Sequence, residues 1–124
     1  MLELARTTNL FQLFGEPTRV RLLALLAREE LSVADLVAVT DLPQSRVSQH
    51  LGKLREAGVL RDRKNGTSTY YALSASMPDE ARKIWSLLDG NSLMKRDDGV
   101  LSSDRSRMQA TRLPRRLYVW SLPS

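Results

Sequence analysis

Apolar residues recur at helical spacing in the N-terminal part of the chain. From Leu2 to Phe14 they are mixed with polar residues in a pattern that stops at Gly15, which predicts a first helix. Pro17 suits the first turn of a second helix. The apolar residues of this second helix, between Val20 and Ala27, are numerous enough for burial around most of its circumference. We therefore expect it to form the centre of the core.

A shorter third helix is predicted next. Ser32 and Asp35 form the Ser-x-x-acid pattern, in which a hydroxyl and a carboxylate cap the first backbone N–H groups of a helix. The helical pattern continues to about Val39. Residues 40–43 read Thr-Asp-Leu-Pro and predict a tight turn.

The stretch from Gln44 to Gly58 predicts a fourth helix with two different faces. Val47, Leu51 and Leu54 follow one another at i, i+4 and i+7, so they form one buried stripe. The opposite face and its flanks carry small, amide-bearing or basic residues: Ser45, Arg46, Ser48, Gln49, His50, Gly52 and Lys53. A short helix, a tight turn and a second helix make up a helix-turn-helix, whose second helix lies in the major groove of DNA.

A β-hairpin is predicted directly after this helix. Asn65-Gly66 lies between two β-compatible runs and is typical of a type I′ turn, because both residues tolerate a positive φ. A hairpin in this position is a wing, and its tip carries side chains suited to phosphates or to the minor groove: Arg63, Lys64, Asn65 and Thr67. The expected fold class is mostly α with a small β-hairpin, a winged helix-turn-helix.

The charge distribution favours a polyanion as partner. The chain has 124 residues, with 19 Lys and Arg against 14 Asp and Glu, a net charge of +5 and a pI near 10.1. Residues 1–43 carry 4 basic and 6 acidic residues, residues 44–73 carry 6 and 2, and residues 74–124 carry 9 and 6. The positive charge therefore begins where the second helix of the helix-turn-helix begins.

Residue usage excludes several classes of function. The chain has no cysteine and one histidine, which removes thiolate nucleophiles, sulfur-ligated metals and any multi-histidine metal site within one chain. It shows no paired acid and base around a nucleophile and no cofactor loop, so we expect no catalytic residues and no enzyme. No apolar stretch approaches the roughly 18 residues that span a bilayer, and the N-terminus lacks the apolar core of a signal peptide. We therefore expect a cytoplasmic protein that does not contact a membrane.

These observations together predict a sequence-specific protein that binds double-stranded DNA. Base-edge and nearby phosphate contacts are expected from Gln44, Ser45, Ser48, Gln49 and His50. Backbone contacts are expected from Arg46, Lys53, Arg63 and Lys64, with Asn65 and Thr67 beside them. For His50, a helix-capping or phosphate role remains open beside base contact. The alternative is a winged helix that binds another protein, which explains the fold but not the basic tip of the wing.

Three segments of the chain carry a family resemblance. They read Leu-Phe-Gly-Glu-Pro-Thr-Arg-Val-Arg-Leu-Leu at 13–23, Leu-Pro-Gln-Ser-Arg-Val-Ser-Gln-His-Leu at 42–51 with Leu-Arg-Glu-Ala-Gly-Val-Leu at 54–60, and Gly-Thr-Ser-Thr-Tyr-Tyr-Ala-Leu at 66–73. In this combination and order they resemble the winged-helix repressors of the ArsR/SmtB type. The resemblance implies a homodimeric transcriptional repressor. Its first and last helices build the dimer, and each recognition helix binds one half of an inverted-repeat operator.

The chain departs from the metal-sensing members of that family. Where those members carry Glu-Leu-Cys-Val-Cys-Asp-Leu, residues 30–36 read Glu-Leu-Ser-Val-Ala-Asp-Leu, so Ser32 and Ala34 replace both thiolates. Other members bind zinc through an Asp-x-His and a later His-x-x-Glu, but no histidine follows His50. Serine and alanine do not replace soft ligands. We therefore expect no metal site and no control of DNA binding by metal.

The last part of the chain is expected to differ from the rest. We expect a winged helix-turn-helix and dimerisation domain at residues 1–90, and a partly helical extension with a basic tail at 91–124. Residues 93–97 and 103–112 resemble the connecting segment of ArsR-type proteins that continue into a methyltransferase domain. No glycine-rich loop for S-adenosylmethionine follows in this sequence, so we expect none of that chemistry here. A regulatory fragment of such a fusion is a further alternative.

A dimer interface is expected on the first helix and on a helix from Met77 to Leu88. A winged helix of this size buries too little apolar surface to hide the apolar residues of both helices, so these should meet a second copy. The residues are Leu10, Phe14, Ile84, Trp85 and Leu88. If an effector exists, we expect a small organic molecule in this interface near Trp85 and Met94, with S-adenosylmethionine or S-adenosylhomocysteine as first candidates. A repressor without an effector is the rival interpretation.

Overall fold

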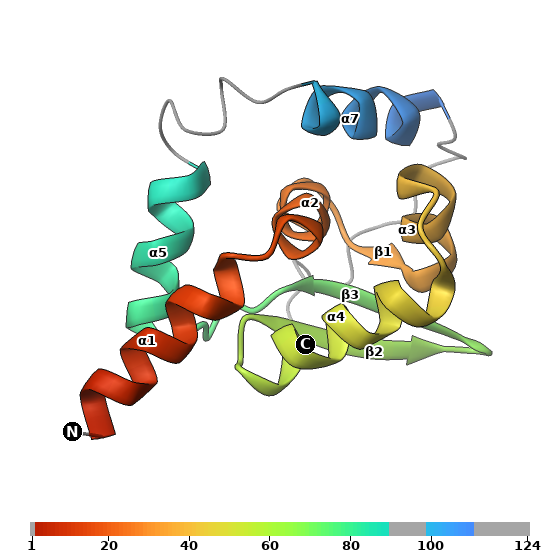
Figure 1. Cartoon of the computed structure of the whole chain (residues 1–124). Coiled ribbons are helices and arrows are strands. Elements are labelled where there is room, and N and C mark those ends of the chain that lie inside the picture. The colour runs from red at the N-terminus through yellow and green to blue at the C-terminus, as the bar shows by residue number, and fades with distance from the viewer. Residues whose placement is uncertain (1, 90–98, 111–124) are drawn as a thin grey trace.

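The two N-terminal helices are present with the expected bounds. The structure, a computed structural model, describes residues 2–89 and 99–110. Helix α1 spans Leu2–Phe14 and helix α2 spans Pro17–Leu26. The carboxylate of Glu16 accepts the backbone N–H of Thr18 at 3.1 Å and so caps α2. Helix α2 lies at the centre of the molecule (Figure 1), as its apolar composition predicts.

The helix-turn-helix consists of α3 (Val33–Thr40) and α4 (Gln44–Glu56). The predicted capping box is confirmed, because Ser32 and Asp35 each cap the other's backbone N–H, at 3.0 and 2.9 Å. In the turn between the helices, Asp41 adopts the left-handed conformation with φ 59°. This conformation ends α3 and redirects the chain into α4.

The wing is confirmed as a hairpin of β2 (Leu60–Asn65) and β3 (Ser68–Leu73), but its turn lies one residue later than expected. Asn65 pairs with Ser68, so Gly66 and Thr67 form the two-residue loop. Gly66 has φ 66°, whereas Asn65 stays at negative φ as a strand residue. A positive φ at only the first loop residue is typical of a type II′ turn, not of type I′.

A third strand, which the sequence analysis missed, completes the sheet. Strand β1 (Leu31–Ser32) pairs antiparallel with β3, giving the order β1-β3-β2. Its two residues are too few for a recognisable alternation of polar and apolar positions. The strand ties the segment before α3 to the wing.

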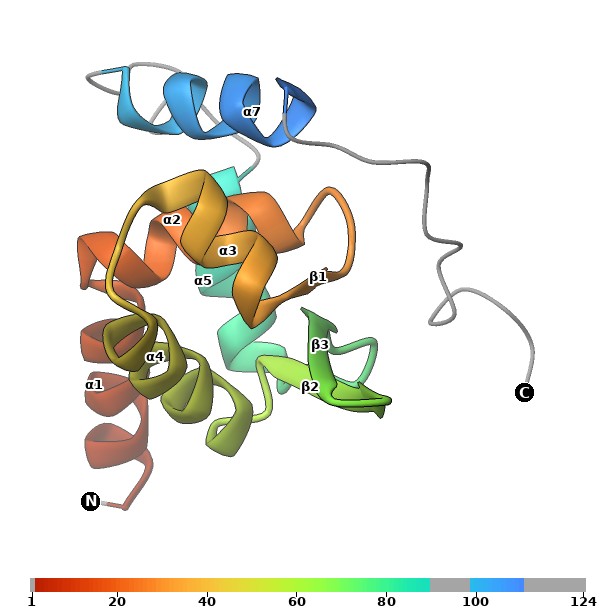
Figure 2. The same cartoon turned by 90° about the vertical axis from the view of Figure 1, so that its right-hand side faces the viewer.

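The remaining helices lie on different sides of α2. Helix α5 (Asp79–Asp89) lies beside α1, and helix α7 (Val100–Ala110) packs across α2 and α3. Figures 1 and 2 both place α7 on the side of the molecule opposite to α4 and the wing. Met108 of α7 belongs to the same core as α2, so the expected boundary near residue 90 does not separate two packing units. The expected basic tail and residues 91–98 lie outside the described residues.

The core contains most of the residues that were expected at a dimer interface. Phe14 is 3% exposed and Trp85 is 7% exposed, and Ile84 is buried with them inside one protomer. Leu10 and Leu88 are half-buried and pack against the same core. Phe14, Ile84 and Trp85 are therefore not left for a second copy, because α1, α2 and α5 cover them within one chain. The large apolar side chains that do stay exposed on α1 and α5 are Leu4, Phe11 and Leu87.

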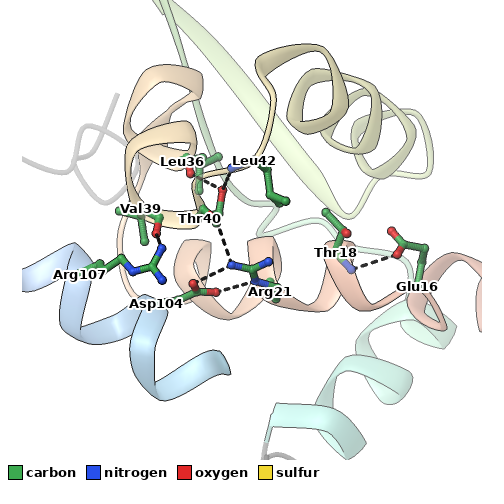
Figure 3. A network of polar contacts seen from close by, with 9 residues as sticks. All are labelled: Glu16, Thr18, Arg21, Leu36, Val39, Thr40, Leu42, Asp104 and Arg107. Atoms are coloured by element: carbon green, nitrogen blue, oxygen red, sulfur yellow. Dashed lines mark hydrogen bonds and ion pairs between the residues drawn. The ribbon is translucent and has the colours of Figure 1, made fainter. Parts of the chain in front are cut away.

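Arginine side chains hold the C-terminal end of α3 (Figure 3). Arg21 of α2 donates Nε and Nη2 to the two carboxylate oxygens of Asp104 on α7, each at 2.9 Å, and Nη2 also donates to the carbonyl of Thr40 at 3.2 Å. Arg107 of α7 donates to the carbonyl of Val39 at 3.0 Å. These carbonyls belong to the last turn of α3, where intrahelical partners are lacking. Helix α7 therefore supports the helix-turn-helix from behind.

Candidate nucleic-acid interface

Helix α4 has the two faces that the sequence predicts. Val47, Leu51 and Leu54 are fully buried against the core. Nothing lies within 4 Å of the position that a Cβ would take at Gly52, so the surface is open there. The exposed side chains of this helix that were expected at DNA are Gln44, Ser45, Arg46, Ser48, Gln49 and Lys53. Such a face can approach base edges closely, since amides and hydroxyls offer both donors and acceptors.

The tip of the wing lies on the same side of the molecule as α4 (Figure 2). Lys64, Asn65 and Thr67 are exposed there, as expected. Strand β2 packs directly beside α4, which holds the wing in place relative to the helix. The structure therefore brings the two expected DNA-contacting elements to one surface.

Arg63 does not belong to this exposed set. Its guanidinium donates to both carboxylate oxygens of Glu30, at 3.1 and 2.6 Å, and lies 4.9 Å from the centroid of the Tyr70 ring. The hydrogen bonds to the buried carboxylate of Glu30 raise the pKa of Arg63. Arg63 thus joins the base of the wing to the segment before β1, and a role in contacting the DNA backbone does not fit its position. A charge run in the sequence does not reveal a partner that lies far away in the chain.

A notch of about 360 Å³ lies between the N-terminal end of α4 and the wing. Its polar lining comprises Ser32, Gln44, Ser48, Thr67, Ser68 and Thr69. Ser68 and Thr69 were missed in the sequence, because strand periodicity alone does not say which face of β3 looks toward α4. Hydroxyl groups of this kind bond readily to phosphate and sugar oxygens. The notch thus places uncharged hydrogen-bonding groups beside the exposed basic side chains of Arg46, Lys53 and Lys64.

His50 lies on the flank of α4 but points into the protein. Its side chain is 14% exposed, and its Nδ1 accepts a hydrogen bond from Arg19 Nε at 3.0 Å. Its Nε2 lies 3.1 Å from Glu16 Oε2. Neither base contact nor phosphate contact fits this environment, because both ring nitrogens face groups of the protein itself. The polar flank of a helix looks the same in sequence whether it meets solvent or another helix end.

Two residues of the segment at 30–36, where metal-sensing members carry their cysteines, cap helix α3 in this chain. The hydroxyl of Ser32 caps α3, and the carboxylate of Asp35 caps the backbone of Ser32. Within residues 2–89 and 99–110, no three His, Asp or Glu side chains come together as a metal site. In the same part of the chain, no helix has the length and apolarity needed to cross a membrane.

Comparison with known proteins gives consistent matches. Residues 16–62 match the family described as bacterial regulatory protein, arsR family. The arsenic resistance transcriptional regulator ArsR1 of Pseudomonas putida is 40% identical over 79 residues, which are 63% of this chain and 62% of that protein. The arsenical resistance operon repressor of Escherichia coli is 42% identical over 77 residues, which are 61% of this chain and 66% of that protein. The alignments thus span less than two thirds of either relative.

The fold is similar to that of solved structures as well. Reduced HlyU from Vibrio cholerae has a TM-score of 0.59 and 32% sequence identity, and the match covers 69% of this chain and 87% of that chain. The predicted winged helix-turn-helix is therefore confirmed.

Proposed function

Because this chain belongs to the ArsR family of bacterial regulatory proteins, we propose that it is a transcriptional repressor that binds an inverted-repeat operator as a homodimer. Its relatives are transcriptional regulators and not enzymes, in agreement with the absence of a catalytic pattern in the sequence. The observation that carries the proposal is the exposed polar face of α4 beside the basic tip of the wing. A winged helix that binds protein would not need this combination of amides, hydroxyls and unburied basic groups.

The proposed dimer uses the outer faces of α1 and α5. Leu4 and Phe11 are separated by two helical turns and lie on one side of α1, and Leu87 is exposed on the neighbouring α5. Large apolar side chains gathered on two adjacent helices favour a self-complementary contact. This contact would leave α4 and the wing of each protomer free for one half of the operator.

Gln49 and Lys64 are expected to contribute to DNA binding in different ways. A glutamine on α4 can pair bidentately with adenine, so Gln49→Ala should cost about 1–3 kcal/mol of discrimination between operator and random DNA. Lys64→Ala should weaken binding to both DNAs alike and reduce the salt slope by about one. The measurement is fluorescence anisotropy across a salt series, with an operator recovered from genomic DNA bound by the protein.

Matched controls separate these effects from a general loss of binding. Gln12→Ala and Arg28→Ala remove an amide and a basic side chain from exposed positions away from α4, the wing, Leu4, Phe11 and Leu87, and should leave both affinities unchanged. An unchanged operator-to-random ratio for Gln49→Ala would remove this residue from direct readout. Equal loss in all four variants would argue against the proposed surface.

The repressor–operator complex is expected to be insensitive to zinc, cadmium, arsenite and thiol oxidants. An effector changes DNA binding only through a difference in affinity between two states of the protein, and without cysteine or a second histidine there is no soft-ligand cluster to create it. Each compound is titrated into the preformed complex. Release of DNA at micromolar metal, reversed by a chelator, would contradict the proposal.

An organic effector would have a different site from the one expected at Trp85. Trp85 is packed in the core, and Met94 lies outside the described residues. A cavity of about 600 Å³ lies between α1 and α5, with a lining that includes Leu10, Leu13 and Pro78 and the charged side chains of Arg6 and Glu80. We propose this cavity as the effector site. The same titration with S-adenosylmethionine and S-adenosylhomocysteine tests this site. If neither compound changes the affinity for DNA, both are excluded as effectors.

A further inference from the structure

The imidazole of His50 on the recognition helix α4 makes polar contacts with the junction of α1 and α2. Arg19 Nε donates to His50 Nδ1 at 3.0 Å, and Arg19 Nη1 donates to the carbonyl of Leu13 at 3.1 Å. On the other side of the ring, His50 Nε2 lies 3.1 Å from Glu16 Oε2, but the two atoms do not have hydrogen-bond geometry. Glu16 Oε2 is buried and accepts no hydrogen bond from any donor. Glu16 in turn caps α2 through Thr18. His50 therefore joins the middle of α4 to the end of α1 and the start of α2.

These contacts define the chemical form of the imidazole. A guanidinium only donates hydrogen bonds, so Nδ1 must be the unprotonated acceptor. The single proton of the neutral ring is then on Nε2, where it faces the carboxylate of Glu16. A second proton, taken from solvent onto Nδ1, would occupy the lone pair that Arg19 uses and would set two cations side by side. The link between α4 and the α1–α2 junction through Arg19 therefore exists only while His50 is neutral, whereas protonation would leave the contact with Glu16 as an ion pair.

The surroundings of His50 favour the neutral ring. Burial lowers the pKa of His50 below its ordinary value of 6.5; the carboxylate of Glu16 opposes this, and the cations Arg19, Arg46 and Lys53 add to it. Because this pKa is lowered, the neutral ring predominates at pH 6.5 and above, and it is lost only when the pH falls through the lowered pKa. Acid, not base, therefore breaks the link.

We propose that His50 is a positioning residue that holds the recognition helix in its DNA-binding orientation as a neutral Nε2–H imidazole, and that its protonation in acid breaks the hydrogen bond from Arg19, shifts α4 and weakens DNA binding. The second half of this inference rests on the proposed function. The link runs to α1, the helix that carries the exposed apolar residues Leu4 and Phe11. In the proposed dimer, His50 thus connects the interface between protomers to the surface that reads DNA.

The first experiment tests the link without DNA. His50 is the only histidine of the chain, so long-range ¹H–¹⁵N correlation spectra of the labelled protein contain one imidazole. We expect the Nε2–H tautomer above pH 6.5 and a pKa below that value, with the backbone amides of α4 shifting in the same titration. Arg19→Gln should raise the pKa of His50, because it removes a neighbouring cation. An Nδ1–H tautomer, a pKa at or above 6.5, or α4 amides that do not follow the titration would overturn the proposal.

The second experiment measures operator affinity at about pH 7.5 and at the pH where the first experiment finds His50 protonated, with His50→Asn as the control for any carboxylate that titrates in the same range. Wild type is expected to lose about fivefold in affinity at the lower pH, the factor that corresponds to one net hydrogen bond. His50→Asn keeps an acceptor oxygen near the position of Nδ1 and does not titrate, so its affinity should be independent of pH in this range. His50→Leu has no acceptor and should bind about fivefold more weakly at both pH values.

The two experiments fail in distinguishable ways. Wild type and His50→Asn with the same pH dependence would overturn the proposal, even if both bind the operator. A wild-type chain that binds no DNA at either pH would overturn the proposed function, while the imidazole spectra and the α4 amides would still decide whether His50 holds the helix. Thermal unfolding of each variant identifies any that fails to fold. In that case Arg19→Gln, which leaves α4 unaltered, takes the place of that variant in the affinity measurement.

Discussion

Replacing Asp104 by alanine is expected to destabilise the protein by about 3 kcal/mol, the lower end of the range for breaking a buried ion pair. Asp104 is 1% exposed, and both of its carboxylate oxygens accept hydrogen bonds from Arg21. Without it, the guanidinium of Arg21 would be left half-buried with only the carbonyl of Thr40 as acceptor. A cavity of about 320 Å³ beside the pair admits water to Arg21, which is why the lower end of the range is expected.

Urea unfolding measures this effect, and matched variants define its origin. Asp79 also pairs with an arginine, Arg82, at 3.0 Å, but on the surface, so Asp79→Ala should cost less than about 1 kcal/mol. Replacing Arg21 by methionine and Asp104 by leucine together should restore much of the stability, since no unpaired charge is then buried. Partial melting of α7 with an unchanged main transition in Asp104→Ala would show that α7 unfolds separately from α2 and α3, and that the pair does not stabilise the whole domain.

Phe11→Glu is expected to convert the proposed dimer to a monomer and to lower operator affinity by about a hundredfold or more, because two linked half-sites bind far more tightly than one. Phe11 is 57% exposed, so the substitution places a carboxylate at the centre of the apolar face without opening the core. Sedimentation should change from a dimer to the 14.0 kDa species. Affinity for an isolated half-site should stay the same.

The control for this variant is Gln12→Glu, which adds the same charge on α1. Gln12 is exposed and lies about 100° further round the helix than Phe11, so the dimer should persist. A dimer that survives Phe11→Glu would place the interface elsewhere. Wild-type protein that sediments only as a monomer at micromolar concentration would contradict the homodimer itself.

The candidate DNA surface could be predicted from the sequence to the extent that it depends on one helix and one hairpin. Val47, Leu51 and Leu54 at helical spacing determine which side of α4 is buried, and the other side must then face outward. The same reasoning failed for His50, on the flank of α4, and for Arg63, in the basic run of β2, because a polar residue in either place has the pattern of an exposed one. Their side chains turn to Glu16 and Glu30, and these partners follow from how α2 and β1 pack, not from the local pattern.

Local sequence was sufficient to predict the features whose causes lie within a few residues of one another. These are the bounds of α1, the capping box at Ser32 and Asp35, the helix-turn-helix and the presence of a wing. Helical and strand periodicity, capping and turn chemistry act over about one turn of chain, so neighbouring residues suffice to predict them.

Contacts between distant residues follow from how the helices and strands pack in three dimensions. Arg63 and Glu30 are 33 positions apart, and Arg21 and Asp104 are 83 positions apart, so no local pattern selects these pairs. The same holds for the burial of Phe14 and Trp85, which depends on how α1, α2 and α5 pack together, and for the docking of α7 against α3. A charged or apolar side chain is stabilised by the groups that pack against it in the folded protein, and these groups cannot be identified from the residues next to it in the sequence.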